Sequence, residues 1–236
     1  KYFRKYLDKF NQPHDTSKYW IKEQEKINRS KGIKFFKTHN ALCKIEGNQF
    51  TNKENTLGVI YIIRDPRNVI TSLSNHYQIS VEDAFQFMTD EKRGIISKEK
   101  ERFLGFQALF SWKLNQKSWV ENKLYPILTV RYEDLQNDAL NTFKQVINFI
   151  NKISKSEEKF NKEKALKCIS NCNFNNLKKL EDEKGFSEAI TKKGSEEKIK
   201  FFNLGKDNDY RKLLNKNLIN KMNNLYQEEL VKFKYE

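Results

Sequence analysis

A histidine with a lysine two positions before it forms the first group of residues whose types could do chemistry. The tetrapeptide is Phe36-Lys-Thr-His39. The ordinary pKa of an imidazole is about 6.5, so a histidine can take a proton from an attacking hydroxyl group at neutral pH. His39 is therefore our candidate for a general base, and a purely structural histidine is the alternative interpretation.

An arginine and a serine eight residues apart form the second group. Arg64 follows the apolar run 58–63, and Ser72 lies eight positions further on. A guanidinium can bind a phosphate through two parallel hydrogen bonds, and a hydroxyl group adds another donor. Asp65 as an N-cap and Pro66 at the first helical position predict that a helix begins between them, with free N–H groups that favour an anion. A surface salt bridge is the alternative role for Arg64.

Short apolar runs and amphipathic stretches alternate along the chain and would position these residues. The runs 58–63 and 127–130 are continuous rather than alternating, which is typical of central strands in a parallel sheet. The run 33–36 is a third candidate strand. Such alternation predicts a parallel sheet covered by helices on both faces. The predicted helices are Pro66–Tyr77, Glu101–Glu121, Asn137–Ile150, Lys159–Ile169 and Asn215–Lys232.

Charged side chains follow each predicted strand at the point where it ends. These segments are Lys37 to His39, Arg64 to Arg67 and Arg131 to Asp134. In open α/β sheets, ligands bind beyond the carboxyl ends of the strands. We therefore expect one histidine, one lysine and three arginines to gather at one sheet edge, where they would bind a polyanion beside a general base.

Four motifs resemble those of the cytosolic and bacterial sulfotransferases, in the family's order. Phe36-Lys-Thr-His39 resembles the Lys-Thr/Ser-His motif, and the segment from Tyr61 to Ser72 resembles the 3′-phosphate-binding motif. Arg131-Tyr-Glu-Asp-Leu135 resembles a segment whose tyrosine lies near the adenine. Phe201 to Tyr210 resembles the nucleotide-covering loop, usually written F-x-R-K-G-x-x-G-D-W. The resemblance runs from about Ile33 to the C-terminus.

The resemblance implies an α/β protein with a three-layer P-loop-like fold, in which a central parallel sheet is flanked by helices. It implies a single sulfotransferase domain over residues 1–236. The activity would be transfer of a sulfuryl group from the co-substrate 3′-phosphoadenosine 5′-phosphosulfate (PAPS) to a hydroxyl or amine acceptor.

The resemblance also assigns roles to residues around the nucleotide. Lys37 would stabilise the charge that develops on the leaving oxygen, and Arg64 with Ser72 would hold the 3′-phosphate. An ordinary solvated lysine is as good an interpretation of Lys37 alone, and a core tyrosine is the alternative for Tyr132. The remaining residues implied to contact the nucleotide are Tyr132, Asn203, Leu204 and Gly205.

Two departures from the family's pattern affect these expectations. Residues 1–32 contain no loop resembling Y-P-K-S-G-x-T-W, which holds the 5′-phosphosulfate in the family. We therefore expect the domain to be truncated at its N-terminus and inactive without that loop. Asn203 and Leu204 stand where the covering loop usually has Arg and Lys, so two cationic contacts are lost unless Lys200 or Lys206 replaces them.

Composition narrows the remaining classes of partner. The net charge of +14 comes from lysines spread along the whole chain, so we expect no nucleic-acid partner. The three cysteines make no disulfide framework, no metal-ligand set is visible, and no apolar run approaches the roughly 18 residues of a membrane span. We expect a cytoplasmic enzyme without a metal cofactor, acting on a small-molecule or glycan acceptor. The motifs leave the acceptor and the oligomeric state open.

Two other functions compete with this interpretation. A nucleotide-dependent phosphotransferase would need a Walker-type lysine loop and carboxylates for Mg²⁺, and neither is visible. A degenerate nucleotide-binding module, or a basic nucleic-acid-binding protein without catalysis, would keep the charge but need no general base. Binding of a nucleic acid would fall steeply with salt.

Overall fold

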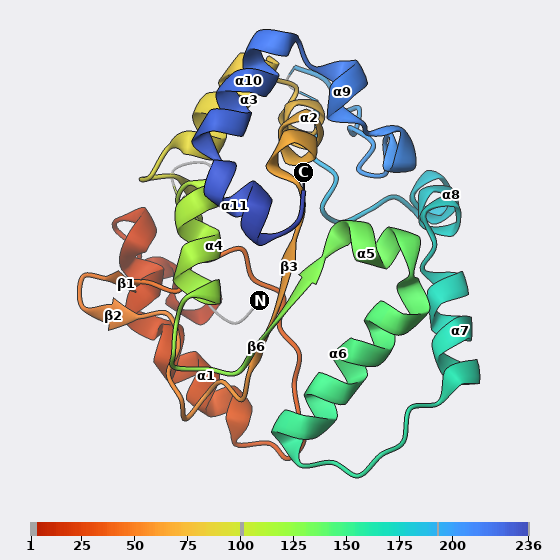
Figure 1. Cartoon of the computed structure of the whole chain (residues 1–236). Helices are drawn as coiled ribbons and strands as arrows, with labels where there is room; N and C mark the ends of the chain where they lie inside the picture. The colour runs from red at the N-terminus through yellow and green to blue at the C-terminus, as the bar shows by residue number, and fades with distance from the viewer. Residues whose placement is uncertain (1–3, 100–101, 193, 236) are drawn as a thin grey trace. The chain divides into compact units, whose positions relative to one another are not determined.

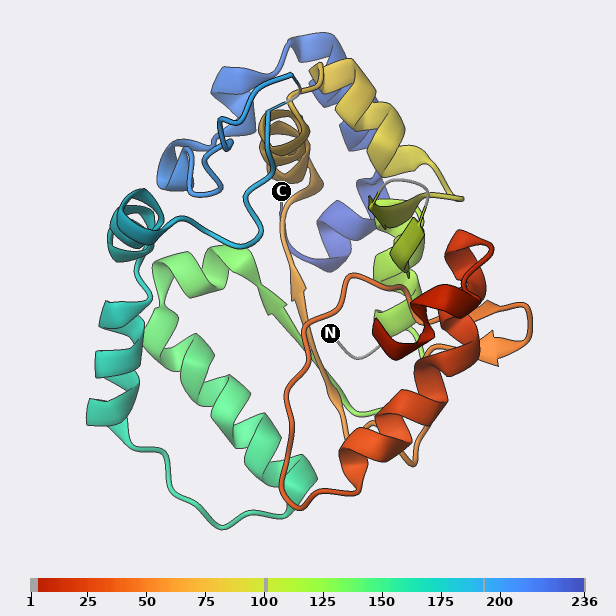
Figure 2. The ribbon, with the colours of Figure 1, turned by 180° about the vertical axis from the view of Figure 1, so that it is seen from behind.

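The computed structural model describes residues 4–99, 102–192 and 194–235 (Figures 1 and 2). The chain divides into two compact units, one of residues 1–61 and 89–129 and the other of residues 62–88 and 130–236. Two neighbouring strands, β3 (Val59–Ile63) and β6 (Ile127–Arg131), pair with each other. They run in the same direction, each leading into a helix at its carboxyl end (Figure 1). The predicted α/β class with a parallel sheet is confirmed, and so are these two predicted strands.

The third predicted strand is wrong. Residues 33–40 are extended but form no strand in the described part of the chain. Their apolar side chains lie in solvent, with Phe35 69% and Phe36 54% exposed. A strand is stabilised by cross-strand side-chain pairs and a buried face, and the described residues give this segment neither.

The predicted helix Glu101–Glu121 is correct only in its second half. Strand β4 (Gly94–Glu99) pairs antiparallel with β5 (Arg102–Ala108), and α4 (Trp112–Val120) begins after them. Ser111 caps α4, because its Oγ accepts the N–H of Leu114 at 3.2 Å. The apolar residues of β5 find a pairing partner in β4, for example Phe106 opposite Ile96. Pairing with that strand therefore outweighs the helical pattern.

The first unit is held together by aromatic side chains. Trp20, in α1 (Trp20–Asn28), packs edge-to-face on Phe50 with ring centroids 5.3 Å apart. Phe50 in turn meets Trp119 of α4 at 6.1 Å. Such edge-to-face pairs are favourable for aromatic rings. The other elements of this unit are η1 (Arg4–Lys9), η2 (Pro13–Tyr19), β1 (Lys44–Ile45) and β2 (Asn48–Gln49).

The second unit is mostly helical and surrounds α2 (Pro66–Tyr77), whose predicted bounds are confirmed. Ile70 of α2 and Met222 are fully buried, and Tyr226 is nearly so. The predicted helix Asn215–Lys232 is two helices, α10 (Lys216–Leu225) and α11 (Gln227–Lys232), that meet at Tyr226. The other elements are α3 (Val81–Thr89), α5 (Tyr132–Asn137), α6 (Ala139–Ser154), α7 (Lys162–Asn171), α8 (Phe174–Lys184), η3 (Gly205–Asp207) and α9 (Tyr210–Leu213). Among the described helices, none has the length and apolar character needed to cross a membrane.

Candidate functional site

The candidate phosphate site lies where β3 leads into α2. Asp65 caps the helix, because its Oδ1 accepts the N–H of Arg67 at 2.9 Å. The side chain of Arg64 extends along the first two turns, and its Nη1 donates to Oγ of Ser72 at 3.1 Å. The Nε of Arg64 is buried and has no hydrogen-bond partner in the described part of the chain. A guanidinium with an unused donor beside a hydroxyl group fits a phosphate. The free N–H groups expected at the start of α2 are absent, because Asp65 accepts the N–H of Arg67 on its side chain and those of Asn68 and Val69 on its carbonyl.

Tyr132, at the start of α5, stacks on this arginine. The guanidinium carbon of Arg64 lies 4.5 Å from the centroid of the tyrosine ring. Gln136, one turn further along α5, lies 3.5 Å from the Tyr132 hydroxyl. The ring face attracts the cation, so Tyr132 restrains Arg64 in the orientation that reaches Ser72.

The covering loop, residues 201–210, is anchored on α8 by a buried carboxylate. Glu181 accepts the backbone N–H groups of Phe201 at 2.8 Å and Phe202 at 2.9 Å. The side chains that replace the family's Arg and Lys, Asn203 and Leu204, are exposed. Two lysines could replace the lost cations. One of them, Lys200, already forms an ion pair with Asp182. Lys206 is exposed in η3.

Gly205 is the residue of this loop that no other amino acid can replace without strain. Its φ is +57°, a conformation that L side chains rarely adopt. A Cβ at this position would lie 2.8 Å from the ring of Phe174, the first residue of α8. Phe174 also packs edge-to-face on Phe202, with centroids 6.1 Å apart. Gly205 therefore lets the loop close onto the α8 aromatic ring.

Substitution of Gly205 by alanine is expected to destabilise the second unit by about 1–3 kcal/mol, the usual cost of backbone strain and overpacking. Denaturant unfolding measures the loss, and limited proteolysis should show faster cleavage within 201–210. Gly47→Ala is the control, because Gly47 also has a positive φ, +80°, in the turn between β1 and β2, but nothing lies within 4 Å of a Cβ there. Equal effects in the two variants would show that contact with Phe174 contributes nothing.

Asn208 connects the covering loop to α2 beside the phosphate site. Its Nδ2 donates to the backbone oxygen of Asn68 at 3.0 Å and to Oγ of Ser72 at 2.9 Å. A second connection runs from the N–H of Tyr210 to Oδ1 of Asn68 at 2.9 Å. Neither Asn208 nor Glu181 is among the residues that sequence reasoning selects. The signal for Asn208 is its place at the second Gly of the F-x-R-K-G-x-x-G-D-W pattern, whereas Glu181 has no such signal.

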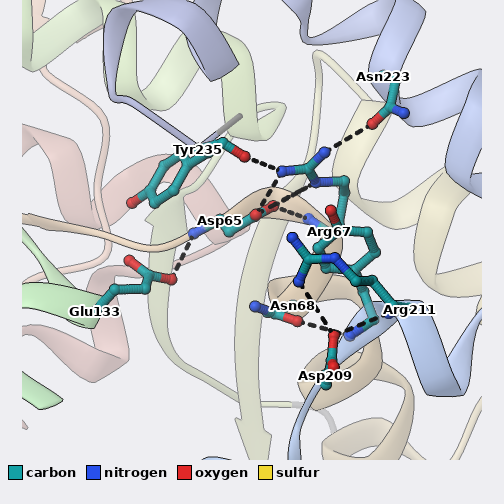
Figure 3. A network of polar contacts seen from close by, with 9 residues as sticks. Asp65, Arg67, Asn68, Glu133, Asp209, Arg211, Asn223 and Tyr235 are labelled. Carbon is teal, nitrogen blue, oxygen red and sulfur yellow. Dashed lines mark hydrogen bonds and ion pairs between the residues drawn. The ribbon is translucent and has the colours of Figure 1, made fainter. Parts of the chain in front are cut away.

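A buried arginine holds the start of α2 in place (Figure 3). The guanidinium of Arg67 pairs with the carboxylate of Asp65 at 2.8 Å and donates to Oδ1 of Asn223 at 2.9 Å. It also donates to the backbone oxygen of Tyr235, and it lies 4.3 Å from the ring centroid of Tyr210. Its donors are thus directed to protein acceptors, so Arg67 shapes the site rather than offering itself to a ligand.

Two further residues of the predicted sheet edge complete this network. Glu133 accepts the backbone N–H of Asp65 at 3.2 Å and so ties α5 to the helix cap (Figure 3). Arg131 stacks on the ring of Tyr235, with its guanidinium carbon 4.9 Å from the centroid, and its Nε lies 3.9 Å from Asp134. Of the three arginines expected to bind a polyanion, Arg64 has the geometry that best fits a ligand.

The candidate base, His39, belongs to the first unit, where its backbone is held firmly. The carbonyl of His39 accepts Nδ2 of Asn115 at 3.1 Å. The next residue, Asn40, accepts the N–H of Ala108 on its side chain at 2.8 Å and Nε1 of Trp119 on its carbonyl at 2.9 Å. His39 and Lys37 are themselves exposed. A general base must reach the proton that it removes, and the exposed imidazole of His39 is open to an approaching acceptor.

The structure brings Arg64 into contact with both Ser72 and Tyr132. Arg64, Ser72, Tyr132 and the loop 203–205 all belong to the second unit, whereas Lys37 and His39 belong to the first. The expected meeting of the base and the phosphate site at one sheet edge therefore stays a prediction. In the described part of the chain, no group of three or more His, Cys, Asp or Glu side chains could hold a metal ion.

Comparison with known proteins assigns the chain to a family. The sulfotransferase domain model matches residues 5–234, and the chain therefore belongs to the sulfotransferase family. It is 27% identical over 228 residues to the flavonol 3-sulfotransferase of Flaveria bidentis, a match that covers 92% of this chain and 69% of that protein.

Two solved structures share the fold. The mouse sulfotransferase SULT7A1 complexed with PAP has a TM-score of 0.51 at 15% identity, over 73% of this chain and 58% of that one. Retinol dehydratase in complex with androsterone and the inactive cofactor PAP has a TM-score of 0.50 at 17% identity, over 75% and 48%. The chain thus spans about half the length of these two proteins.

Proposed function

We propose that this chain binds the nucleotide PAPS and takes part in sulfuryl transfer to a hydroxyl or amine group. The observation that carries the proposal is Arg64, which precedes α2, reaches Ser72 in its second turn and has a buried Nε without a hydrogen-bond partner in the described part of the chain. Both related structures contain PAP, which is 3′,5′-ADP, the nucleotide left when PAPS has lost its sulfuryl group. Membership of the sulfotransferase family supports the same reaction.

In this proposal the residues divide between binding and chemistry. Arg64 and Ser72 hold the 3′-phosphate, Tyr132 restrains Arg64 beside the adenine, and the loop with Asn203, Leu204 and Gly205 covers the nucleotide. His39 takes the proton from the acceptor hydroxyl as its oxygen forms the new bond to sulfur. Lys37 stabilises the charge on the bridging oxygen as the bond from that oxygen to sulfur breaks. The products are the sulfated acceptor and 3′,5′-ADP.

The acceptor in this proposal is a small molecule or a glycan, and the enzyme works in the cytoplasm. The flavonol 3-sulfotransferase is named for a small phenolic acceptor, which supports the first of these statements. A panel of phenols, flavonols and sugar alcohols, each offered with labelled PAPS, tests it.

Replacement of Arg64 by alanine is expected to weaken the affinity for 3′,5′-ADP by about 10–100-fold. This is the usual effect of losing a hydrogen bond to a charged group. The affinity for 5′-AMP should change little, because 5′-AMP lacks the 3′-phosphate that Arg64 holds. Isothermal titration with both nucleotides measures the two dissociation constants.

Lys216→Ala is the matched control for Arg64→Ala, because it also removes one positive charge from the second unit at an exposed position. It should leave both affinities unchanged. An equal loss of 3′,5′-ADP and 5′-AMP affinity in Arg64→Ala would count against a 3′-phosphate site.

Thermal unfolding separates the proposal from its alternatives. A ligand that binds only the native state raises the melting temperature. We expect 3′,5′-ADP to raise it and ATP with Mg²⁺ to leave it unchanged. The reverse result would favour a phosphotransferase, and binding of nucleic acid with a steep salt dependence would favour a nucleic-acid-binding module.

A further inference from the structure

The asparagine at position 208 departs from the covering-loop pattern and lies at the phosphate site. The pattern F-x-R-K-G-x-x-G-D-W has its second Gly at this position, where a side chain would be absent. Here the side chain is present and buried, with 8% of the residue exposed. Its amide lies against the side of α2 that carries Ser72.

The orientation of the Asn208 amide is fixed by its neighbours. Nδ2 faces the backbone carbonyl of Asn68 at 3.0 Å, and a carbonyl oxygen can only accept. Oδ1 contacts the hydroxyl of Thr71, which donates to it. A rotation of the amide by half a turn would place two oxygens against each other at Asn68, so Nδ2 must be the atom that reaches Ser72.

This arrangement determines what the Ser72 hydroxyl can offer. A serine hydroxyl has one proton to donate and two lone pairs that accept. The oxygen accepts from Nη1 of Arg64 at 3.1 Å and from Nδ2 of Asn208 at 2.9 Å, which occupies both lone pairs. Within the described part of the chain, the Ser72 proton can then point only to the carbonyl oxygen of Asn68. At 3.3 Å this is the longest of the three contacts of the hydroxyl group. Ser72 is itself exposed, so this proton can turn to a ligand oxygen.

We propose that Asn208 is a positioning residue that makes Ser72 an obligatory donor to the 3′-phosphate and so contributes to selection of a 3′-phosphorylated nucleotide. This inference rests on the proposed function. A hydroxyl whose lone pairs are both occupied can only donate, so it favours an acceptor such as a phosphate oxygen over a donor. The side chain also contributes hydrogen bonds between the loop and α2 that a glycine could not make.

The test compares the affinities of 3′,5′-ADP and 5′-AMP in four single variants of the whole chain and in one double variant. In Asn208→Gly, the preference for 3′,5′-ADP over 5′-AMP should fall by about 3–10-fold, which is the usual effect of losing one hydrogen bond on a binding affinity. In Asn208→Asp it should fall further, because a carboxylate cannot donate to Ser72 and repels the phosphate. Thr71→Val is the control, since it removes a contact of Asn208 but leaves Nδ2 and Ser72 in place, and it should keep the preference.

The fourth variant, Ser72→Ala, tests whether Asn208 acts through the serine. In the Ser72→Ala background, Asn208→Gly should cause no further loss of preference, whereas independent sites would give additive losses. Additive losses, or an equal weakening of both nucleotides in Asn208→Gly and Asn208→Asp, would overturn the inference and leave Asn208 a structural residue.

The outcomes also separate this inference from the proposed function. If Arg64→Ala abolishes the preference for 3′,5′-ADP while both Asn208 variants retain it, the phosphate site stands and the role of Asn208 is wrong. If Arg64→Ala itself retains the preference, the phosphate site is wrong as well. Unfolding of each variant without ligand shows whether Asn208→Gly is folded, and the nearly isosteric Asn208→Asp replaces it if it is not.

Discussion

Replacement of His39 by alanine is expected to lower the turnover of sulfuryl transfer by about 10²–10⁴-fold, the usual contribution of a general base. The acceptor oxygen must lose a proton as it attacks sulfur, and the variant removes the side chain that takes it. The affinity for 3′,5′-ADP should stay the same, because the proposed phosphate-binding residues belong to the other unit. Initial rates with labelled PAPS and a panel of phenols and flavonols measure turnover.

His14→Ala is the matched control for the base. The imidazole of His14 is also partly exposed in the first unit and lies 2.9 Å from Glu46. It stands in no family motif, so its loss should leave turnover near that of the wild type. Near wild-type turnover in His39→Ala would exclude this histidine as the base. A similar loss in both variants would indicate a general disturbance of the unit.

Replacement of Arg67 by alanine should destabilise the second unit by about 3–5 kcal/mol, the cost of removing one partner of a buried ion pair. Arg67 and Asp65 are each only 5% exposed, so the carboxylate of Asp65 would lose its counter-charge away from water. The carbonyl of Tyr235 and the amide of Asn223 would lose a donor as well. Denaturant unfolding measures the change in the free energy of unfolding.

Two further variants identify the cause of the Arg67 effect. Arg211 stacks on the same Tyr210 ring, at 4.6 Å, but its side chain is 66% exposed. Arg211→Ala should therefore cost under about 1 kcal/mol. Asp65→Asn in the Arg67→Ala background should recover part of the stability, because asparagine still caps α2 and carries no charge. A loss below about 1 kcal/mol in Arg67→Ala would contradict the buried pair.

Local sequence patterns predict the elements that depend on neighbouring residues. Asp65 and Pro66 predict the start of α2, and the continuous apolar runs predict β3 and β6, because capping and burial on both faces act within a few residues. The sequence does not predict the pairing of β4 with β5, because the apolar residues of β5 are equally compatible with a helix. Only the partner strand β4 decides between the two. The exposed segment 33–36 shows the reverse error, since an apolar run is only a strand when another strand pairs with it.

The sequence by itself determined the family of this protein and the residues nearest to the proposed chemistry. Arg64 precedes α2 and Ser72 lies in its second turn, so the helix that the sequence predicts brings Ser72 within reach of the long Arg64 side chain. Only the tertiary structure showed that Asn208, 136 residues from Ser72, completes that pair, and that Arg67 binds a carbonyl 168 residues away rather than a ligand. A hydrogen bond depends on tenths of an ångström and on direction, and long-range packing sets both.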